Sequence, residues 1–515
     1  MRHHPLTATF TTNEKGMAVY ELSDWQQRAQ QQRFIDRAMI GGRLVGAQSG
    51  ATFASINPAS GALLANVAAC DATDVDLAVS AARQSFEAGI WSQRSPVERK
   101  QVLLKLAELI LVHRDELALL DSLNMGKPVM DAWNIDVPGA AGVFRWYAES
   151  LDKLYDEVAP SACNVLATIT REALGVVAAV VPWNFPLDMA AWKLAPALAA
   201  GNSVILKPAE QSPFSALRLA ELALEAGIPE GVFNVVTGLG ETAGKALGRH
   251  MDVDCLAFTG STEVGKYFMG YSAQSNLKQV WLECGGKSAN LVFADCQDLD
   301  LAAEKAAFGI FFNQGEVCSA NSRLLVERSI HDEFVERVIA KSRDWQPGDP
   351  LNPASRAGAI VEQRQTARIM EFIGSAQADG AQLACGGKQL SFNGSDNFIE
   401  PTIFTGVAPD SRLARDEVFG PVLAVTPFDS EEQAVQLAND SIYGLAASLW
   451  SDDLNRAHRV ARRLKAGTVS VNTVDALDVS TPFGGGKQSG FGRDLSLHSF
   501  DKYTQLKTTW FQLRP

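Results

Sequence analysis

The sequence predicts an α/β protein with parallel sheets covered by helices on both faces. Between residues 174 and 258, short apolar runs alternate with amphipathic segments of helical length. The run at residues 176–181 is apolar throughout, which is typical of a strand buried on both faces. The same alternation resumes after Gly285-Gly286. A repeated β-α order predicts parallel sheets whose ligands lie at the carboxyl ends of the strands.

Local signals place the elements that come before the first sheet. Residues 38–45 predict a small hairpin around Gly41-Gly42, and residues 74–87 predict an amphipathic helix. Ser95 and Glu98 form a capping-box pattern around a proline at the first helical position, which predicts the start of another helix. A further helix is expected to end near residues 125–128. Residues 1–16 are polar and are expected to fray.

The two runs of alternating elements are then taken in order. The first predicts strands at 176–181, 203–206, 232–236 and 255–258, with helices at 189–198, 215–226 and 241–247. The second predicts strands at 290–293, 323–326, 422–425, 446–450 and 468–471, with helices at 299–312, 330–345, 431–438 and 453–464. Residues 503–511 alternate apolar and polar side chains, which predicts a strand with one covered face that pairs with another chain.

Composition excludes several classes of function. The 515 residues allow two to four domains. A net charge of -13 argues against a nucleic-acid or acidic-membrane partner, because both need a basic surface. No stretch approaches ~20 uninterrupted apolar residues, and the N-terminus lacks a signal-peptide core, so neither a membrane span nor secretion is expected.

The seven cysteines are odd in number and widely spread, with no CxxC pair or Cys/His cluster. Neither a disulfide framework nor a metal site is predicted, and a reducing, cytoplasmic compartment is expected. Cys318 stands apart because it follows an apolar run and Gly315, in a loop that a small carbonyl could reach. Most free cysteines are small buried hydrophobes, however, and a nucleophile needs a special microenvironment.

Polar residues at predicted strand ends carry the other candidate chemistry. Asn184 either satisfies backbone groups in a turn fixed by two prolines or stabilises an oxyanion. Lys207 and Glu210 are either solvated or bonded to ribose hydroxyls. Glu283 is either an ordinary exposed acid or a general base. Turns at 237–241 and 258–265 could bind phosphate at a helix start, but neither fits G-x-G-x-x-G.

Together these stretches resemble the NAD(P)-dependent aldehyde dehydrogenase superfamily, from about residue 35 to the end of the chain. Further matching signatures lie at residues 417–422, 482–485 and 489–493. The resemblance implies a Rossmann-like cofactor domain, a second α/β catalytic domain and a small β oligomerisation element. In this sequence the implied parts are an N-terminal extension (1–35), the NAD-binding domain (36–148 and 169–284), the catalytic domain (285–485) and the oligomerisation element (149–168 and 486–515).

The resemblance also implies a role for each matching residue. Cys318 would be the nucleophile, Asn184 the oxyanion ligand and Glu283 the general base, with Lys193 and Asp494 relaying protons from that base. Many members have Glu where this chain has the shorter Asp494, which calls that relay, but not the core chemistry, into question. Cys284 also replaces the usual Leu or Ala. Implied cofactor contacts are Val181, Pro182, Trp183, Lys207, Glu210, Gly240, Thr259, Gly260, Ser261, Glu417 and Phe419.

An acid at position 210 would repel a 2′-phosphate, so NAD is expected rather than NADP. The reaction implied is oxidation of an aldehyde to a carboxylic acid through a thiohemiacetal and a thioester on Cys318. Water would be the acyl acceptor, although coenzyme A is an alternative. A non-catalytic binding protein on the same scaffold also stays open, since fold alone does not decide function.

The stretch from Gly490 to Lys507 resembles the branch that oxidises γ-glutamylaminobutyraldehyde and other ω-aminoaldehydes in polyamine catabolism. A cationic amine would favour acids at the mouth of the substrate tunnel, and a general aliphatic aldehyde is the alternative. The residues expected to contact substrate are Asp136, Phe185, Asp188, Trp192, Asp478 and Phe483. The family further implies a homo-oligomer, either a dimer or a tetramer.

Overall fold

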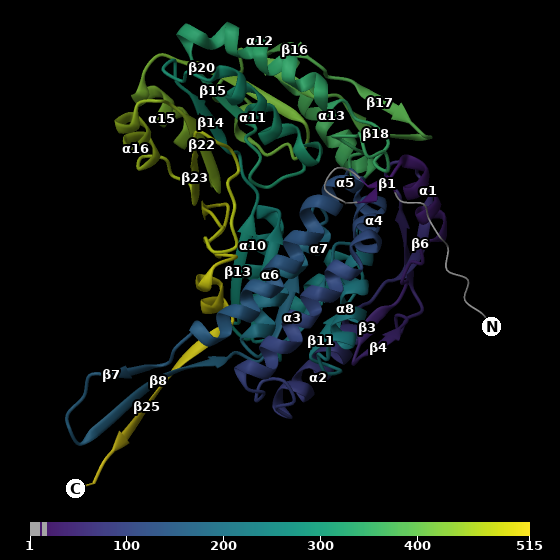
Figure 1. The fold of residues 1–515 in the computed structure, drawn as a ribbon, viewed down its shortest axis with the longest axis vertical. Helices are drawn as coiled ribbons and strands as arrows, with labels where there is room; N and C mark the ends of the chain where they lie inside the picture. Colours follow the sequence, from purple (N-terminus) through teal and green to yellow (C-terminus); the bar gives the residue numbers. More distant parts are fainter. Residues whose placement is uncertain (1–10, 13–17, 515) are drawn as a thin grey trace.

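A computed structural model describes residues 11–12 and 18–514, which form two lobes and a projecting arm (Figure 1). Each lobe is built around a seven-stranded sheet, and the arm is a sheet of three strands. The predicted fraying N-terminal stretch lies outside the described residues, apart from Thr11–Thr12 (β1), which pairs with Ala18–Val19 (β2). None of the described helices has the length and apolar character needed to cross a membrane.

The first sheet has the strand order β13-β12-β9-β10-β11-β3-β4. Five neighbouring strands run parallel, and β3 joins antiparallel to β11. This confirms both the predicted parallel sheet and the predicted hairpin. In chain order the strands are Ala38–Ile40 (β3), Arg43–Val45 (β4), Val176–Val180 (β9), Ser203–Lys207 (β10), Phe233–Val235 (β11), Cys255–Gly260 (β12) and Gln279–Cys284 (β13).

Helices cover both faces of this sheet, and their ends follow the local signals. Ser95 Oγ accepts from the Glu98 N–H while the Glu98 carboxylate accepts from the Ser95 N–H, so the predicted capping box is confirmed. Gly126, at φ 88°, ends the helix before it in the left-handed conformation that favours glycine. The helices are Ala72–Glu87 (α2), Pro96–Val112 (α3), Arg114–Met125 (α4), Val137–Ser150 (α6), Pro186–Ala199 (α7), Phe214–Ala226 (α8), Lys245–Arg249 (α9) and Thr262–Ala273 (α10).

The second sheet has the order β16-β19-β20-β15-β14-β22-β23, parallel except for its edge strand β16. Its strands are Ala289–Val292 (β14), Arg323–Glu327 (β15), Gln382–Cys385 (β16), Thr402–Thr405 (β19), Val422–Phe428 (β20), Ala446–Trp450 (β22) and Thr468–Val471 (β23). The helices around it are Leu299–Phe311 (α11), His331–Ser342 (α12), Gln363–Ala378 (α13), Arg412–Arg415 (α14), Glu431–Asn439 (α15) and Leu454–Ala461 (α16).

The remaining elements are short and mostly connect the larger ones. They are Leu22–Gln31 (α1), Thr52–Ile56 (β5), Leu63–Ala68 (β6), Val129–Asp131 (α5), Ala132–Asp136 (η1), Leu151–Lys153 (η2), Gly240–Gly244 (η3), Phe312–Gly315 (η4), Arg328–Ile330 (η5), Arg343–Trp345 (η6), Gln389–Phe392 (β17), Ser395–Ile399 (β18), Tyr443–Gly444 (β21), Gly486–Lys487 (β24) and Leu497–Lys502 (η7). The last strand of the first sheet, β13, and the helices α6, α10 and α13 were not predicted as elements.

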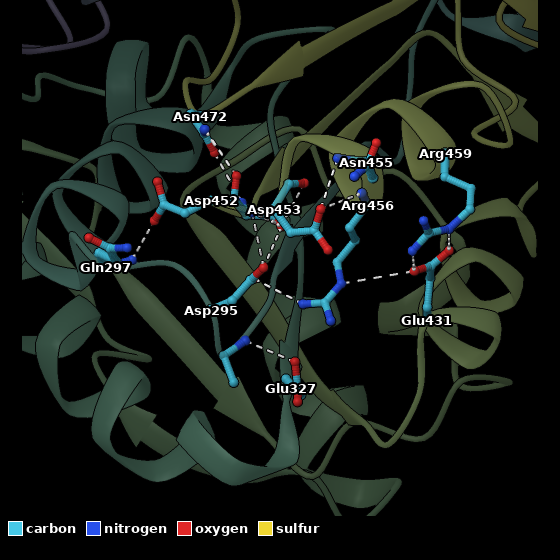
Figure 2. A network of polar contacts seen from close by, with 12 residues as sticks. Asp295, Gln297, Glu327, Glu431, Asp452, Asp453, Asn455, Arg456, Arg459 and Asn472 are labelled. Carbon is cyan, nitrogen blue, oxygen red and sulfur yellow. Dashed lines mark hydrogen bonds and ion pairs between the residues drawn. The ribbon is translucent and has the colours of Figure 1, made fainter.

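A polar network closes the carboxyl edge of the second sheet (Figure 2). Asp295, just after β14, pairs with Arg456 at 3.0 Å and accepts from Ser451 Oγ at 2.9 Å. The Gln297 N–H donates to Asp452 at 2.6 Å, and Arg459 forms a bidentate pair with Glu431. These bonds join the ends of β14 and β22 to the helices α15 and α16.

The arm places the C-terminal strand at the edge of a small sheet. Thr504–Gln512 (β25) pairs along its whole length with Val165–Ala173 (β8) of the same chain, and β25 is the edge strand, so its pairing with another chain stays a prediction. Glu157–Ala159 (β7) completes the arm on the other side of β8. Because the chain returns through residues 157–173 before it enters the first sheet, an internal partner strand is already present. The C-terminus lies at the tip of the arm (Figure 1).

The two large sheets face each other through the ends of their strands. The carboxyl ends of β9, β12 and β13 in the first sheet face the loops that lead into β15 and β20 of the second, and residues from both sides line one cavity. The first sheet has its last strand at Cys284, and the second begins at Ala289. The domain boundaries themselves stay a prediction.

Candidate active site

A cavity of about 470 Å³ lies between the facing edges of the two sheets. Apolar and aromatic side chains form most of its wall, among them Phe185, Trp192 and Phe483. The few polar groups that line it include Asn184, Glu283 and Cys318. A mostly apolar cavity with a few convergent polar groups is the usual form of a small-molecule site.

Cys318 reaches this cavity from a tight loop after α11. Asn313, Gln314 and Gly315 all have positive φ (49°, 56° and 73°), so the chain reverses within three residues. A Cβ at position 315 would lie 2.3 Å from the Gly420 backbone, so only glycine fits there. The loop then presents the half-buried Cys318 thiol to the cavity wall.

Asn184 lies opposite, directly after strand β9. The Asn184 side-chain Nδ2 donates to the Glu316 backbone carbonyl at 2.8 Å. The backbone carbonyl of Asn184 accepts from Asn313 Nδ2 at 3.1 Å. These two bonds tie the strand end to the cysteine loop across the gap between the sheets. Only one of the two hydrogens on the Asn184 amide is used in this way, and the side chain lines the cavity.

Glu283, near the end of β13, is buried with an unusual lack of partners. Neither carboxylate oxygen has a hydrogen-bond partner among the described residues. Two glycines make room for it, because a Cβ at Gly484 or Gly492 would lie 2.6 or 2.8 Å from Oε1. Burial, followed by the charge of Asp494, raises the pKa of Glu283 well above its ordinary value.

Two lysines and one acid lie behind Glu283. Asp494 forms buried ion pairs with Lys193 through one oxygen and with Lys502 through the other. Burial opposes the charged form of Asp494, but the two lysines together lower its pKa. Both lysines also act to lower the pKa of Glu283, in opposition to burial and Asp494.

The surroundings of Cys318 favour the thiol over the thiolate. Burial first, and then the charges of Asp475, Glu417 and Glu283, raise the pKa of the thiol. Asp475 also accepts from Ser319 Oγ at 2.6 Å, next to the nucleophile candidate. The arrangement therefore needs a change in the cavity, or a base, before the thiolate becomes abundant.

The cavity wall near Cys318 also combines backbone and carboxylate groups. The Gly286 N–H donates to Glu417 Oε1 at 3.0 Å, and burial raises the pKa of Glu417 to about 7. The Phe419 ring lies edge-on to Trp183 with centroids 5.2 Å apart. Thr259 Oγ1 is buried without a partner among the described residues, and Ser261 caps the start of α10.

Comparison with known proteins decides what this arrangement belongs to. The sequence model of the aldehyde dehydrogenase family matches residues 44–509. The chain belongs to the aldehyde dehydrogenase family. The resemblance stated from the motifs and the predicted aldehyde dehydrogenase fold are therefore confirmed.

Aldehyde dehydrogenases of known sequence and structure match nearly the whole chain. It is 52% identical over 497 residues to the NADP/NAD-dependent aldehyde dehydrogenase PuuC of Escherichia coli, covering 96% of this chain and 100% of PuuC. It is 50% identical over 475 residues to aminoacetaldehyde dehydrogenase of Pseudomonas aeruginosa, covering 92% and 95%. The crystal structure of γ-glutamyl-γ-aminobutyraldehyde dehydrogenase from Burkholderia cenocepacia has a TM-score of 0.94 at 53% identity, covering 96% and 100%.

Within this aldehyde dehydrogenase, the structure brings most of the residues predicted from sequence to one place. The cavity wall contains Pro182, Trp183, Asn184, Phe185, Asp188, Trp192, Thr259, Gly260, Ser261, Glu283, Cys318, Glu417, Phe419 and Phe483. Glu210 lines a neighbouring cavity of about 580 Å³ instead, and it accepts from Lys207 Nζ at 3.1 Å. Val181, Lys193 and Gly240 are not part of the central wall.

Two predicted substrate contacts do not line the cavity, and their roles stay predictions. Asp136 is fully buried and forms an ion pair with Lys127, away from the cavity wall. Asp478 is exposed and accepts from the Ser480 N–H at 2.8 Å, outside the cavity. Of the three acids predicted at the tunnel mouth, only Asp188 lines the cavity, and its Oδ1 has no hydrogen-bond partner among the described residues.

Several cavity residues were missed from the sequence. Gln365 and Arg368 come from α13, a helix that was not predicted, and Asp475 comes from a loop without periodicity. Lys502, which lies behind Glu283 and not in the cavity wall, was missed because a lysine next to Tyr503 looks like an ordinary solvated side chain. A signal was available only for Asp475, which follows the predicted strand at 468–471 by a few residues.

Proposed function

We propose that this aldehyde dehydrogenase oxidises an aliphatic ω-amino- or γ-glutamylamino-aldehyde to the carboxylic acid, with NAD as oxidant and water as acyl acceptor. The observation that carries the proposal is the convergence of a thiol, an amide and an unpartnered carboxylate on one cavity. Cys318, Asn184 and Glu283 reach it from three different elements of two sheets. A binding protein has no need of this combination.

Cys318 is the nucleophile in this proposal. Its thiolate sulfur forms a bond to the aldehyde carbon, and the carbonyl electron pair moves onto oxygen. The free hydrogen of the Asn184 amide and the Cys318 backbone N–H are the donors that would hold this oxyanion. Since Asn184 is already fixed by its bond to Glu316, it needs little reorganisation as the charge develops.

A second group of residues in the cavity wall fits a dinucleotide. The buried, unpartnered hydroxyl of Thr259 and the start of the 12-residue helix α10 at Ser261 offer donors to a pyrophosphate. Glu417 and Phe419 would hold the nicotinamide ribose, and Lys207 with Glu210 the adenosine ribose. A nicotinamide held there would supply the oxidant, since loss of a hydride from the substrate carbon to it would leave a thioester on Cys318.

Glu283 completes the reaction in this proposal. As a carboxylate it takes a proton from water, whose oxygen attacks the thioester carbon. The carbon–sulfur bond then breaks, the thiolate of Cys318 leaves, and the carboxylic acid is released. Burial raises the pKa of Glu283, and a carboxylate with a raised pKa is a stronger base than an ordinary one.

The choice of cofactor and of substrate follows from two acids. The Glu210 carboxylate would repel a 2′-phosphate, which favours NAD, although PuuC is named as NADP/NAD-dependent. Asp188 places an acid on the cavity wall beside Phe185 and Trp192, where a substrate ammonium would give it a partner. The relatives named for aminoacetaldehyde and γ-glutamyl-γ-aminobutyraldehyde support this substrate class.

Assembly and compartment are part of the same proposal. The arm exposes Leu506, Trp510 and Phe511, at 60%, 66% and 48% of their surfaces, which favours burial against another copy as a dimer or tetramer. All seven cysteines are free thiols, which is in keeping with a cytoplasmic enzyme. Light scattering on the purified protein would determine the number of copies.

A direct assay tests the proposed function. Purified protein is mixed with NAD and with a panel of aminoaldehydes, γ-glutamylated aldehydes and plain alkanals, and the absorbance of NADH is followed. Asn184→Ala should lower kcat by about 10²–10³-fold, as loss of one oxyanion donor does. Cys318→Ser should abolish NADH formation while NAD still binds.

Three results would contradict the proposal. If no NADH forms when aldehyde is added, a binding protein is favoured. If turnover requires added coenzyme A, coenzyme A and not water is the acyl acceptor. If alkanals are oxidised as efficiently as the amino-substituted aldehydes, the protein is a general aliphatic aldehyde dehydrogenase.

A further inference from the structure

Lys502 is the least expected member of the charged group behind Glu283. It ends η7, immediately before the arm strand β25, and it is only 2% exposed. Its ammonium contacts one oxygen of Asp494, while Lys193 contacts the other. Asp494 therefore has two buried cations, one more than its own charge needs.

The backbone around Lys502 is fixed from both sides. Its carbonyl accepts from Cys255 Sγ at 3.4 Å, and the next carbonyl, that of Tyr503, accepts from Asn202 Nδ2 at 2.9 Å. Both partners belong to the first sheet and its flanking loop. The ammonium is thus delivered to Asp494 by a rigid segment rather than by a freely moving side chain.

Charge balance shows what the second lysine does. Asp494 with Lys193 alone is a neutral pair, so an ionised Glu283 beside that pair would be a buried, uncompensated charge. With Lys502 present, the two acids face two lysines. Half-exposed Arg493 also favours the charged form of Glu283, but less than either lysine, and burial raises the pKa of the nearby thiols of Cys284 and Cys318.

We propose that Lys502 is a positioning residue for the hydrolytic step: its ammonium offsets the charge of Asp494 and so lets Glu283 act as a carboxylate base. The inference rests on the proposed function, since it assigns a role within water activation. Lys502 does not touch the substrate. In the step concerned, Glu283 takes a proton from water, the water oxygen bonds to the thioester carbon, and the carbon–sulfur bond breaks.

The test separates the hydrolytic step from the steps before it. Wild type and Lys502→Met are mixed with NAD and aldehyde, quenched in acid, and the fraction of enzyme acylated on the Cys318 peptide is measured by mass spectrometry across pH. The variant should accumulate acyl-enzyme at neutral pH. Its pH midpoint for hydrolysis should move up by about one unit or more, a tenfold loss of base at a given pH.

Three further variants keep the outcome decisive. Lys502→Arg retains the charge and should restore the wild-type midpoint. Asp494→Asn combined with Lys502→Met removes the acid together with its cation, so its midpoint should shift less than that of Lys502→Met alone. Lys278→Met removes another buried lysine, at the opposite end of β13, where Nζ donates to the Gly248 carbonyl at 2.8 Å. It should leave the midpoint unchanged.

An unchanged midpoint in Lys502→Met, with wild-type levels of acyl-enzyme, would overturn the inference. So would an equal shift in Lys278→Met, which would indicate a general loss of stability. If Lys502→Met fails to fold, the double variant takes its place, and a midpoint far above wild type would then overturn the inference. Failure of the proposed function is distinguished at the outset, because wild type itself would then form no acyl-enzyme.

Discussion

The two seven-stranded sheets share one architecture but treat their carboxyl edges in opposite ways. The edge of the first sheet opens onto the central cavity, where Glu283, Thr259 and Asp188 carry oxygens without hydrogen-bond partners among the described residues. The edge of the second is closed by the network around Asp295, Arg456 and Glu431. The second sheet contributes to the cavity mainly through the loops before β14, β15 and β20, and also through Asp475 and Leu477 from the segment after β23.

The difference separates stability from function in this fold. Buried polar groups without partners cost folding free energy, and they persist where a ligand or a reacting group will supply the missing partner. Charged groups that are paired at a surface edge hold strands and helices together, and they need no ligand. Variants at the carboxyl edge of the first sheet should therefore change activity, with large effects. Variants at the carboxyl edge of the second sheet should change stability, with small effects.

The largest effect is expected at Glu283. Glu283→Gln removes the proposed base and should lower the rate of thioester hydrolysis by about 10²–10⁴-fold, the usual contribution of a general base. The same change removes a buried carboxyl group without partners, so the melting temperature should stay the same or rise. Hydrolysis is followed by acid quench and stability by thermal melting.

The pH dependence of wild type gives the matching control. Because the pKa values of both Glu283 and Cys318 are raised, their basic forms are lost as pH falls, and the rate should increase as pH rises. In Glu283→Gln the rate of thioester hydrolysis should no longer depend on pH. A large fall in melting temperature for this variant would contradict the view of the first edge as functional rather than stabilising.

A smaller effect is expected at Asp188. Asp188→Leu should raise KM for an aminoaldehyde by about tenfold or more, because a hydrogen bond to a charged group contributes about 1.5–3 kcal/mol. The KM for hexanal should change little, since an alkanal offers no cation to the acid. Steady-state kinetics measure the KM of variant and wild type for both aldehydes, and the two KM changes are then compared.

Asp478→Leu is the matched control for Asp188. It makes the same substitution at an exposed acid that lies outside the cavity, and it should change neither KM. Equal effects of Asp188→Leu on both aldehydes would remove the specificity role. An effect of Asp478→Leu comparable to that of Asp188→Leu would point to long-range charge rather than direct contact.

The elements of both sheets were largely predictable because buried parallel strands are apolar on both faces. Runs such as residues 176–181 stand out for this reason alone, and the structure confirms them. Strand β13 was missed because it mixes exposed and buried positions and carries the charged residue Glu283 next to its last residue. Its place in the sheet depends on pairing with β12, which sequence periodicity does not contain.

The candidate site was predictable in its residue types but not in its pairings. Asp136 and Asp188 were both predicted as acids at the mouth of the substrate tunnel. The structure separates them through Lys127, which pairs with Asp136 and leaves Asp188 on the cavity wall. Lys502 likewise acquires meaning only through its contact with Asp494. Such tertiary ion pairs leave no periodic trace in a sequence.

The smallest effect is expected at the closed edge of the second sheet. Arg456 is 29% exposed, pairs with Asp295 at 3.0 Å, and lies over the Phe293 ring at 5.0 Å. Because such partly exposed pairs contribute about 1 kcal/mol or less, Arg456→Met should lower the melting temperature by less than about 3 °C. Since no bond of this network involves a residue of the cavity wall, kcat, KM and the pH profile should match wild type. A loss of activity without a loss of stability would show that the closed edge communicates with the open one, and the two edges could then no longer be treated as independent.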